Sequence, residues 1–373
     1  MGEAPDSLPH DTVLPHDAVF PDDAVLRRET VLPYDALLVV SFGGPEKHED
    51  VLPFLETVLR GKNVPRKRLL EVAGHYYHFD GKTPINDHTR ALISLLEKEL
   101  AGKGPRLPVY WGNRNWHPFL ADTIGRMADD GVRRALAFVT SAYGSYSSCR
   151  QYLEDIERAR AEVGARAPIV EKIRNFYNHP GFIEPMAAHV REALATFPPE
   201  SRPAVELVYT AHSIPASMAR TSKYAGQLEE ASRLVSERAG RSEARLVFQS
   251  RSGPPSQPWL EPDICDYLRE LAASQRTRDV VVAPIGFLSD HLEVLFDLDT
   301  EAREVARELG LNMVRAATVG VHPRFITMIR ELIVERVYAK EERPALGALG
   351  PEPDFCPADC CPRPQRPAAR PES

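Results

Sequence analysis

Short apolar runs alternate with amphipathic helical stretches along most of this chain, and this alternation restricts the fold more than any other feature. The apolar runs are continuous, as expected for strands that are buried on both faces of a parallel sheet. They lie at Ala36–Phe42, Val109–Gly112, Arg134–Thr140, Val205–Ala211, Arg245–Gln249 and Asp279–Pro284. The sequence therefore predicts an α/β protein whose parallel sheets are flanked by helices.

Helical patterns lie between these runs, near 47–60, 86–102, 117–130, 149–163, 180–196, 223–239, 262–274, 290–309 and 322–340. A polar, Pro-rich stretch around 164–180 separates two halves of similar size. We expect two Rossmann-like domains, an N-terminal one at 34–175 and a C-terminal one at 176–341, with the final helix packing back. In such folds ligands bind beyond the carboxyl ends of the strands.

The two ends of the chain differ in composition from the middle. Residues 1–33 repeat a hexapeptide, as in Leu8-Pro-His-Asp-Thr-Val13 and Leu14-Pro-His-Asp-Ala-Val19. A proline at every sixth residue excludes helix and central strand, so we predict a disordered, low-complexity tail. Residues 342–373 are rich in Pro and Cys. We expect this second tail to need a ligand to become ordered.

Charge and hydropathy exclude several classes of function. The 373 residues carry a formal net charge of −7, which argues against a nucleic-acid-binding surface. The apolar runs are too short to span a bilayer, and the N-terminus lacks the pattern of a secretory signal. No Gly-x-Gly-x-x-Gly or Walker sequence follows a strand, which disfavours nucleotide binding. We expect a cytoplasmic protein without a transmembrane segment.

Two features near the ends of predicted strands suggest chemistry. His212 follows an apolar strand, where it is either structural or able to bind a metal and accept a proton. Glu293, Asp297 and Glu301 are spaced four apart and share one face of a predicted helix. A solvated acidic face is one interpretation of this stripe. A site for a divalent cation or a proton relay is the other.

Four sequence blocks resemble the ferrochelatase family, in the family's order, between about Tyr34 and Val337. They are Ser41-Phe-Gly-Gly-Pro-Glu46, Thr210-Ala-His-Ser-Ile-Pro215, Phe248-Gln-Ser-Arg-Ser-Gly253 with Pro258-Trp-Leu-Glu-Pro-Asp263, and Pro284-Ile-Gly-Phe-Leu-Ser-Asp-His-Leu-Glu-Val-Leu295. Gly112-Asn-Arg-Asn-Trp116 and Ser141-Ala-Tyr-Gly-Ser-Tyr146 are similar to actinobacterial members. The resemblance implies a class II chelatase-like fold.

The resemblance implies a role for each matching residue. His212 and Glu293 would be catalytic and would contact the metal, facing each other across the porphyrin plane, and Asp297 and Glu301 would continue as an acidic ridge. Substrate contacts are expected from Thr83, Tyr152, Phe42 and Arg60. Phe42 replaces a tyrosine of some relatives, which excludes an axial bond to iron. Leu59 replaces an arginine that helps some relatives bind propionates, and only the adjacent Arg60 remains.

The chain has five cysteines, and four of them form a second group of candidate metal ligands. Cys356, Cys360 and Cys361 are close in sequence, and Cys149 matches the internal ligand of cluster-bearing ferrochelatases. Four thiolates are typical of a two-iron two-sulfur cluster, the 2Fe-2S type. Zinc and an unligated tail are the alternatives. Cys265 lies in a helical pattern and is predicted to be a small buried side chain.

Together these features predict an enzyme, a lyase that inserts Fe(II) into coproporphyrin III to give coproheme in heme biosynthesis. A ferrochelatase acting on protoporphyrin IX is the main alternative, and a cobalt or nickel chelatase is a weaker one. A non-catalytic tetrapyrrole carrier or iron–sulfur sensor is the alternative from another class. The expected partners are the porphyrin and ferrous iron, and the chain is expected to be a monomer or a homodimer.

Overall fold

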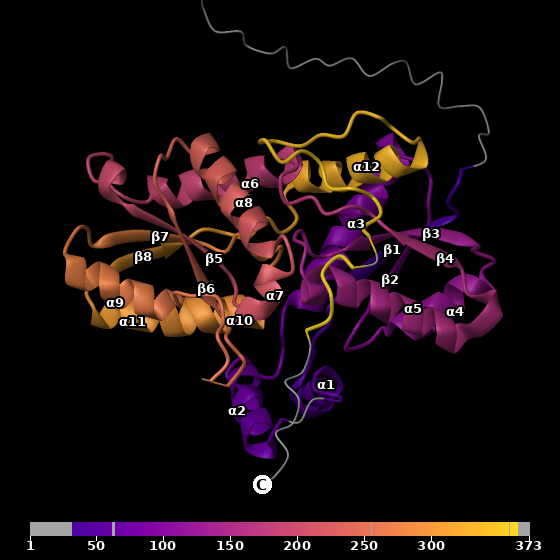
Figure 1. Cartoon of the computed structure of the whole chain (residues 1–373), viewed down its shortest axis with the longest axis horizontal. Coiled ribbons are helices and arrows are strands. Elements are labelled where there is room, and N and C mark those ends of the chain that lie inside the picture. The colour runs from indigo at the N-terminus through magenta and orange to yellow at the C-terminus, as the bar shows by residue number, and fades with distance from the viewer. Residues whose placement is uncertain (1–31, 62–63, 255, 358, 365–373) are drawn as a thin grey trace, which may run out of the picture. The chain divides into compact units, whose positions relative to one another are not determined.

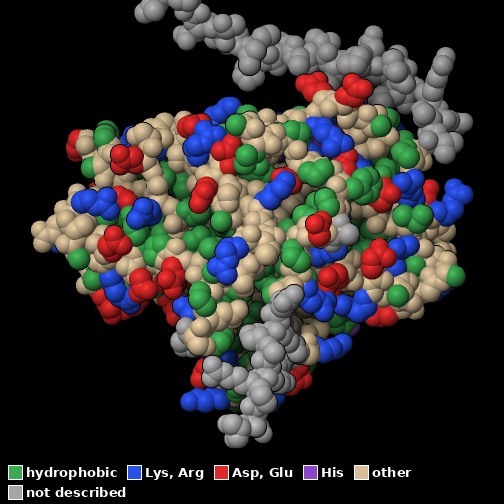
Figure 2. Space-filling model, in the orientation of Figure 1, with side chains coloured by type: hydrophobic (Ala, Val, Ile, Leu, Met, Phe, Trp, Pro, Cys, Tyr) green, Lys and Arg blue, Asp and Glu red, His purple; other side chains and the backbone are tan. Residues whose placement is uncertain are grey.

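The computed structural model describes residues 32–61, 64–254, 256–357 and 359–364 (Figure 1). The hexapeptide repeats and the disorder predicted for them lie outside these residues. Within them, no helix is both long enough and apolar enough to span a membrane. Acidic and basic side chains are interspersed over the face shown in Figure 2.

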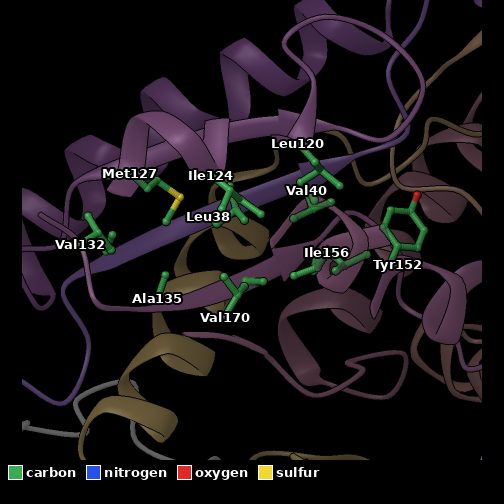
Figure 3. Close-up of a cluster of buried hydrophobic side chains, with 14 residues drawn as sticks. Leu38, Val40, Leu120, Ile124, Met127, Val132, Ala135, Tyr152, Ile156 and Val170 are labelled. Carbon is green, nitrogen blue, oxygen red and sulfur yellow. The ribbon is translucent and has the colours of Figure 1, made fainter. Parts of the chain in front are cut away.

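The first sheet has four parallel strands in the order β2-β1-β3-β4. They are β1 (Ala36–Ser41), β2 (Val109–Asn113), β3 (Arg134–Val139) and β4 (Ile169–Lys172). Alternate β1 side chains pack on α4 (Leu120–Asp129) and α5 (Gln151–Val163), which form one core cluster with the sheet (Figure 3). The other face is covered by α3 (Ile85–Lys103). Because both faces are covered, every residue of β1 is buried.

The second sheet repeats this plan with the strand order β6-β5-β7-β8, again all parallel. Its strands are β5 (Glu206–His212), β6 (Arg245–Gln249), β7 (Asp279–Ala283) and β8 (Asn312–Arg315). One face packs on α9 (Ile264–Ser274) and on the region that ends in α11 (Arg303–Glu308). The opposite face is covered by α6 (Pro180–Ala195) and α8 (Tyr224–Arg238) (Figure 1). The predicted α/β architecture is therefore confirmed.

The structure adds elements that the periodicity did not predict. Each sheet has a fourth strand at its edge, β4 in the first sheet and β8 in the second. Both strands are four residues long and contain polar as well as apolar residues. The predicted helix at 47–60 is α1 (Val51–Val58), and α2 (Arg66–Tyr77) follows it without having been predicted. A short helix, α7 (Ala216–Arg220), follows β5. The predicted helix at 290–309 is divided into α10 (Leu292–Phe296), a π-helical segment at Asp297–Ala302, and α11.

The C-terminal helix α12 (Pro323–Val337) packs against both α3 and α6, so it connects the helical layers of the two sheets. The tail that follows is held by the protein itself. Asn178 bonds to the backbone of Leu346 in both directions, at 2.8 and 3.2 Å, and to the carbonyl of Gly350 at 2.8 Å. Arg174 donates to the carbonyl of Pro344 at 3.0 Å. These contacts attach residues 344–350 to the body of the protein, and the expectation that the tail needs a ligand to become ordered stays a prediction.

Arg174 also forms the most deeply buried ion pair between α12 and the rest of the protein. Its guanidinium donates twice to Glu335, at 2.8 and 2.9 Å, and the two side chains are 1% and 5% exposed. A buried pair of this kind needs both partners, because removing one leaves an uncompensated charge in a region of low dielectric constant.

We therefore expect Glu335→Gln to lower the free energy of unfolding by about 3–5 kcal/mol, since Arg174 would stay buried and lose its counter-charge. Urea denaturation followed by circular dichroism measures this change. The matched control is Arg166→Gln, which breaks the exposed Arg166–Asp129 pair and should cost less than about 1 kcal/mol. Equal effects of the two variants would contradict the prediction.

Candidate active site

His212 is the last residue of β5, where the buried apolar strand reaches the edge of the sheet. Its carbonyl accepts a hydrogen bond from the Tyr224 hydroxyl at 3.0 Å, and its ring Nδ1 lies 2.5 Å from the Ser213 carbonyl. These contacts leave Nε2 to face the opposite side of the site. The side chain is 33% exposed. The sequence placed His212 at a carboxyl end of a strand, and the structure agrees.

Glu293 lies in the first turn of α10, opposite His212. The His291 side chain caps this helix by accepting the backbone N–H of Glu293 at 3.2 Å. The Glu293 Oε1 and His212 Nε2 atoms are 3.5 Å apart. Burial alone would lower the pKa of His212, but the Glu293 carboxylate and the Ser213 carbonyl outweigh burial and raise it to about 9. Burial opposes ionisation of Glu293 too, yet His212 lowers the pKa of Glu293 to about 2.

The two side chains are in direct contact, at 3.5 Å. A flat macrocycle between them would need a van der Waals contact on each face, or about 7 Å between the two side chains. Their expected placement on opposite faces of a porphyrin stays a prediction, and it requires the two side chains to separate when the ring binds.

The acidic ridge continues from Glu293 along the π-helical segment, but its members differ in environment. Ser250 donates to Asp297, and the Gln249 amide lies 3.4 Å from the same carboxylate. Burial raises the pKa of Asp297 to about 7, against the Ser250 hydrogen bond and with help from neighbouring carboxylates. Glu301 is exposed overall. Part of its side chain is nevertheless buried, and this burial and the negative charge of Asp263 raise the pKa of Glu301. The interpretation as a solvated face thus describes Glu301 but not Asp297.

Helix α2 brings aromatic and imidazole side chains against α10. The His75 and Phe296 rings stack with centroids 3.8 Å apart. Tyr76 lies near Glu293. Burial is the main cause that raises the pKa of the Tyr76 phenol, and the negative charge of Glu293 adds to it. The apolar residues of α2 recur at helical spacing, which is a signal that could have located it in the sequence.

The predicted substrate contacts fall in two places. Thr83 is buried, 4% exposed, and its methyl group packs against Gly44. Tyr152 is also buried, under the Arg114 guanidinium at 4.3 Å from its ring (Figure 3 shows the hydroxyl). Arg114 lies 5.7 Å from the Phe42 ring as well. The structure therefore brings Phe42 and Tyr152 together through Arg114, and Thr83 packs on the loop that follows Phe42, where its amide donates to the Pro45 carbonyl at 3.0 Å.

Arg114 also lines a cavity of about 300 Å³ with Arg60 and Arg158. Asp155, which pairs with both Arg114 and Arg158, forms part of the same wall. This cavity lies beside the carboxyl ends of β1 and β2, since the Arg114 amide donates to the Ser41 carbonyl at 3.0 Å. Sequence reasoning gave Arg114 no role, although it stands within one of the family-like blocks.

The structure gathers four of the five cysteines. Cys360 and Cys361 have sulfur atoms 3.6 Å apart, and Cys149 and Cys356 line one cavity of about 190 Å³. Burial and the neighbouring Cys360 and Cys149 thiols raise the pKa of Cys356 to about 11. All five thiols are free. Cys265 is instead near Asp263 and Glu301, and burial together with these charges raises its pKa to about 12.

Within the described ranges, no three His, Cys, Asp or Glu side chains are arranged as a ready set of ligands for a single metal ion. This holds for the His212 site and for the cysteine site alike. His212 and Glu293 provide two ligand atoms close together, and Asp297 stands one helical turn beyond them.

We expect the Glu293→Gln substitution to lower the pKa of His212 by more than one unit, because burial then acts without the opposing carboxylate. Titration of the imidazole by NMR measures this, with Glu301→Gln as the control that should leave His212 unchanged. The folded pKa of His212 lies above its ordinary value of about 6.5, and the folded pKa of Glu293 lies below its ordinary value of about 4.5, so this pair stabilises the fold fully between those two pH values. The stabilisation is lost as the pH rises through about 9 or falls through about 2. An unshifted His212 in Glu293→Gln would contradict the assignment.

Comparison with known proteins shows which family the chain resembles. The ferrochelatase family profile matches residues 34–337. The chain is 54% identical over 330 residues to a ferrochelatase of Rhodopirellula baltica, covering 88% of this chain and 93% of that protein. It is 50% identical over 360 residues to a coproporphyrin III ferrochelatase of Streptomyces coelicolor, covering 90% of this chain and 96% of that protein.

A solved structure shares the fold at low sequence identity. SirB of Bacillus subtilis, described with Fe3+, aligns with a TM-score of 0.51 and 12% identity, over 81% of this chain and 95% of that one. This likeness concerns the fold alone. The family match over residues 34–337, together with close relatives that align over nearly their whole length, shows that this chain belongs to the ferrochelatase family.

Proposed function

We propose that this protein inserts Fe(II) into coproporphyrin III to form coproheme. The observation that carries the proposal is the contact between His212 and Glu293 at the carboxyl edge of the second sheet, next to the partly buried Asp297. A metal chelatase needs ligands for the incoming cation and acceptors for the two pyrrole protons in one place. The choice of coproporphyrin III rests on relatives that are named coproporphyrin III ferrochelatases, such as the Streptomyces coelicolor protein, which is 50% identical in sequence.

The roles of the residues follow from their protonation at neutral pH. With a pKa of about 9, His212 holds a proton while Glu293 is ionised, so the pair stores one proton at rest. We propose that arrival of the cation, written here as substrate, displaces this proton to Asp297, from which it passes to water, and that the Nε2 lone pair is free once the cation has moved into the ring. His212 then accepts one pyrrole proton, and the Glu293 carboxylate relays the other outward. Asp297, whose pKa of about 7 populates both of its states, suits the next step outward, and the exposed Glu301 suits release to water.

We further propose that the cavity lined by Arg60, Arg114 and Arg158 receives a carboxylate of the substrate. Guanidinium groups bind carboxylates in a planar, bidentate manner. In this scheme Arg60 supplies the guanidinium that some relatives carry at the position of Leu59. Tyr152 contributes indirectly, because its ring packs under Arg114 and helps to position that side chain. Thr83 supports the loop at Gly44 in this scheme, because its side chain is packed away from solvent. Phe42 offers an apolar face to the ring.

The test is anaerobic metallation followed by absorbance, with coproporphyrin III and protoporphyrin IX offered separately. We expect faster turnover of coproporphyrin III and a loss of about 10²–10⁴-fold in His212→Ala, the range for removal of a general base. Cys265→Ser is a control that should retain the rate. Preference for protoporphyrin IX would replace the substrate proposal. Absence of turnover with either would favour a tetrapyrrole carrier or an iron–sulfur sensor.

We propose separately that Cys149, Cys356, Cys360 and Cys361 hold a 2Fe-2S cluster. Two observations support this proposal: Cys149 and Cys356 line one cavity, and the Cys360 and Cys149 thiols lie close enough to Cys356 to raise its pKa together with burial, so free thiolates are disfavoured there. Cations bound to the sulfurs would stabilise the thiolates. Five free thiols also suit a reducing compartment, and we propose the cytoplasm.

Anaerobically purified protein should contain equimolar iron and inorganic sulfide, with visible absorption that disappears in Cys149→Ser. Cys265→Ser should keep both, because that thiol lies by the acidic ridge and not with the other four. Metal analysis distinguishes the alternatives. Protein that contains zinc but no sulfide would show a zinc site in place of the cluster. Protein that contains neither iron nor zinc would show that the thiols are unligated.

A further inference from the structure

Two buried asparagines lie next to the residues proposed to contact the substrate. Asn113 is the last residue of β2 and is 0% exposed, and Asn86 lies in the first turn of α3 and is 1% exposed. The Asn113 amide nitrogen lies 3.4 Å from the Asn86 amide oxygen, and we call these two residues the asparagine pair. Buried amides need a partner for each polar atom, so such a pair holds its neighbours in one arrangement.

Asn86 holds the loop that carries Phe42. Its amide nitrogen donates to the Gly44 carbonyl and to the Glu46 carboxylate, both at 3.0 Å. Thr83, three residues earlier in the chain, packs its methyl group on Gly44 as well. The start of α3 therefore fixes the loop that runs from Phe42 to Glu46.

Asn113 holds the same loop from the side of β2. Its amide oxygen accepts the Trp111 indole N–H at 2.9 Å, and its amide nitrogen donates to the His117 carbonyl at 2.9 Å. Gly43 packs on the Asn113 side chain with a φ of +79°, and a Cβ atom at Gly43 would come within 2.8 Å of the Asn113 Cβ. Glycine alone accepts both this backbone conformation and this close approach without strain. The loop and Asn113 are therefore in direct contact.

The residues that follow Asn113 connect it to the cavity proposed for the carboxylate. Arg114 comes next in the chain and lines that cavity, and its backbone N–H donates to the Ser41 carbonyl at 3.0 Å. Asn115 donates to the Phe42 carbonyl from its backbone at 3.1 Å and from its side chain at 3.3 Å. The asparagine pair therefore joins the segments that carry the Phe42 ring and the Arg114 guanidinium, which are 5.7 Å apart.

We propose that the asparagine pair positions the Phe42 ring against the Arg114 guanidinium, so that the ring and a carboxylate of the tetrapyrrole bind together. Both asparagines are shielded from solvent and act through their neighbours, which makes them positioning residues. The inference rests on the proposed function in one respect, namely that Phe42 and Arg114 contact the porphyrin. Hydrogen-bonded amides suit this task, because an apolar pair would fill the same space without fixing the direction of its neighbours. The pair belongs to the first sheet and His212 to the second, so the metal step should not depend on the pair.

The test measures binding of metal-free coproporphyrin III to the full chain, by the anisotropy of porphyrin fluorescence, together with the KM values of anaerobic metallation. We expect Asn86→Ala to raise the porphyrin Kd about fivefold or more, within the range of coupling between residues in contact. The KM for Fe(II) should change by less than about twofold, because the metal site is built on the other sheet. In a Phe42→Ala background, Asn86→Ala should change the Kd by less than about twofold, since the ring that it positions is absent.

Three further variants make the result specific. Glu46 is 39% exposed, so Glu46→Ala should fold, and by removing one partner of Asn86 it should weaken porphyrin binding in the same direction. Arg90→Gln breaks the exposed ion pair to the same carboxylate and should leave the Kd unchanged. Asn178→Ala is the matched control for loss of stability, because Asn178 is also a buried asparagine with several backbone bonds, and it should leave the Kd unchanged. An unchanged Kd in Asn86→Ala and Glu46→Ala, or the same weakening with and without Phe42, overturns the positioning role.

The outcomes also separate this inference from the function on which it rests. Wild-type protein that binds neither coproporphyrin III nor protoporphyrin IX would overturn the proposed function and the positioning role with it. An unchanged Kd in both Phe42→Ala and Arg114→Ala would overturn the assigned substrate contacts. Rapid metallation by wild type together with an unchanged Kd in Asn86→Ala would keep the enzyme and reject the positioning role.

Discussion

The arrangement of this protein depends on the requirement that parallel strands be buried on both faces. The central strands β1 and β5 are mostly apolar and covered by helices on both faces, so polar side chains that are open to the surroundings stand mainly where these strands end. His212 and Gln249 are paired at the ends of β5 and β6 for this reason. The same edge of the sheet meets the loop that leads to Glu293. The chemistry is thus concentrated at one edge because the sheet excludes it elsewhere.

Electrostatics at that edge are set by contact and burial acting in opposite directions. Burial penalises every charge, and the contact between His212 and Glu293 compensates for it in both partners. At Asp297, burial and the neighbouring carboxylates outweigh the Ser250 hydrogen bond and the charge of His212, and they raise its pKa to about 7. A row of chemically similar carboxylates therefore has three different environments. The proposed outward transfer of protons along the ridge uses this difference between the three environments.

The C-terminal tail shows how a segment without helix or strand can be ordered by polar contacts. Asn178 and Arg174 bond to its backbone, and Arg336 and Lys223 pair with its acids. These partners come from elements next to both sheets. The tail consequently delivers three cysteines to the fourth and also contacts the start of the helix that holds His212.

The sequence by itself determined the α/β class, the strands that carry the site, and the residues of the acidic ridge. Continuous apolar runs and helical spacing are local signals, and they are strong wherever an element is fully buried. Edge strands β4 and β8 and helix α2 have weaker patterns, although α2 retains a helical one. The grouping of Cys149 with the tail cysteines came from family resemblance and not from spacing.

Only the tertiary structure decided which side chains meet. The contact between His212 and Glu293, the covering of Tyr152 by Arg114, and the burial of Thr83 join residues that are far apart in the chain. Such contacts depend on how helices settle on the sheets, and no local pattern encodes that packing. The π-helical segment was likewise not predicted by the spacing of its carboxylates, and its first residue, Asp297, accepts a hydrogen bond from Ser250, which is distant in the chain.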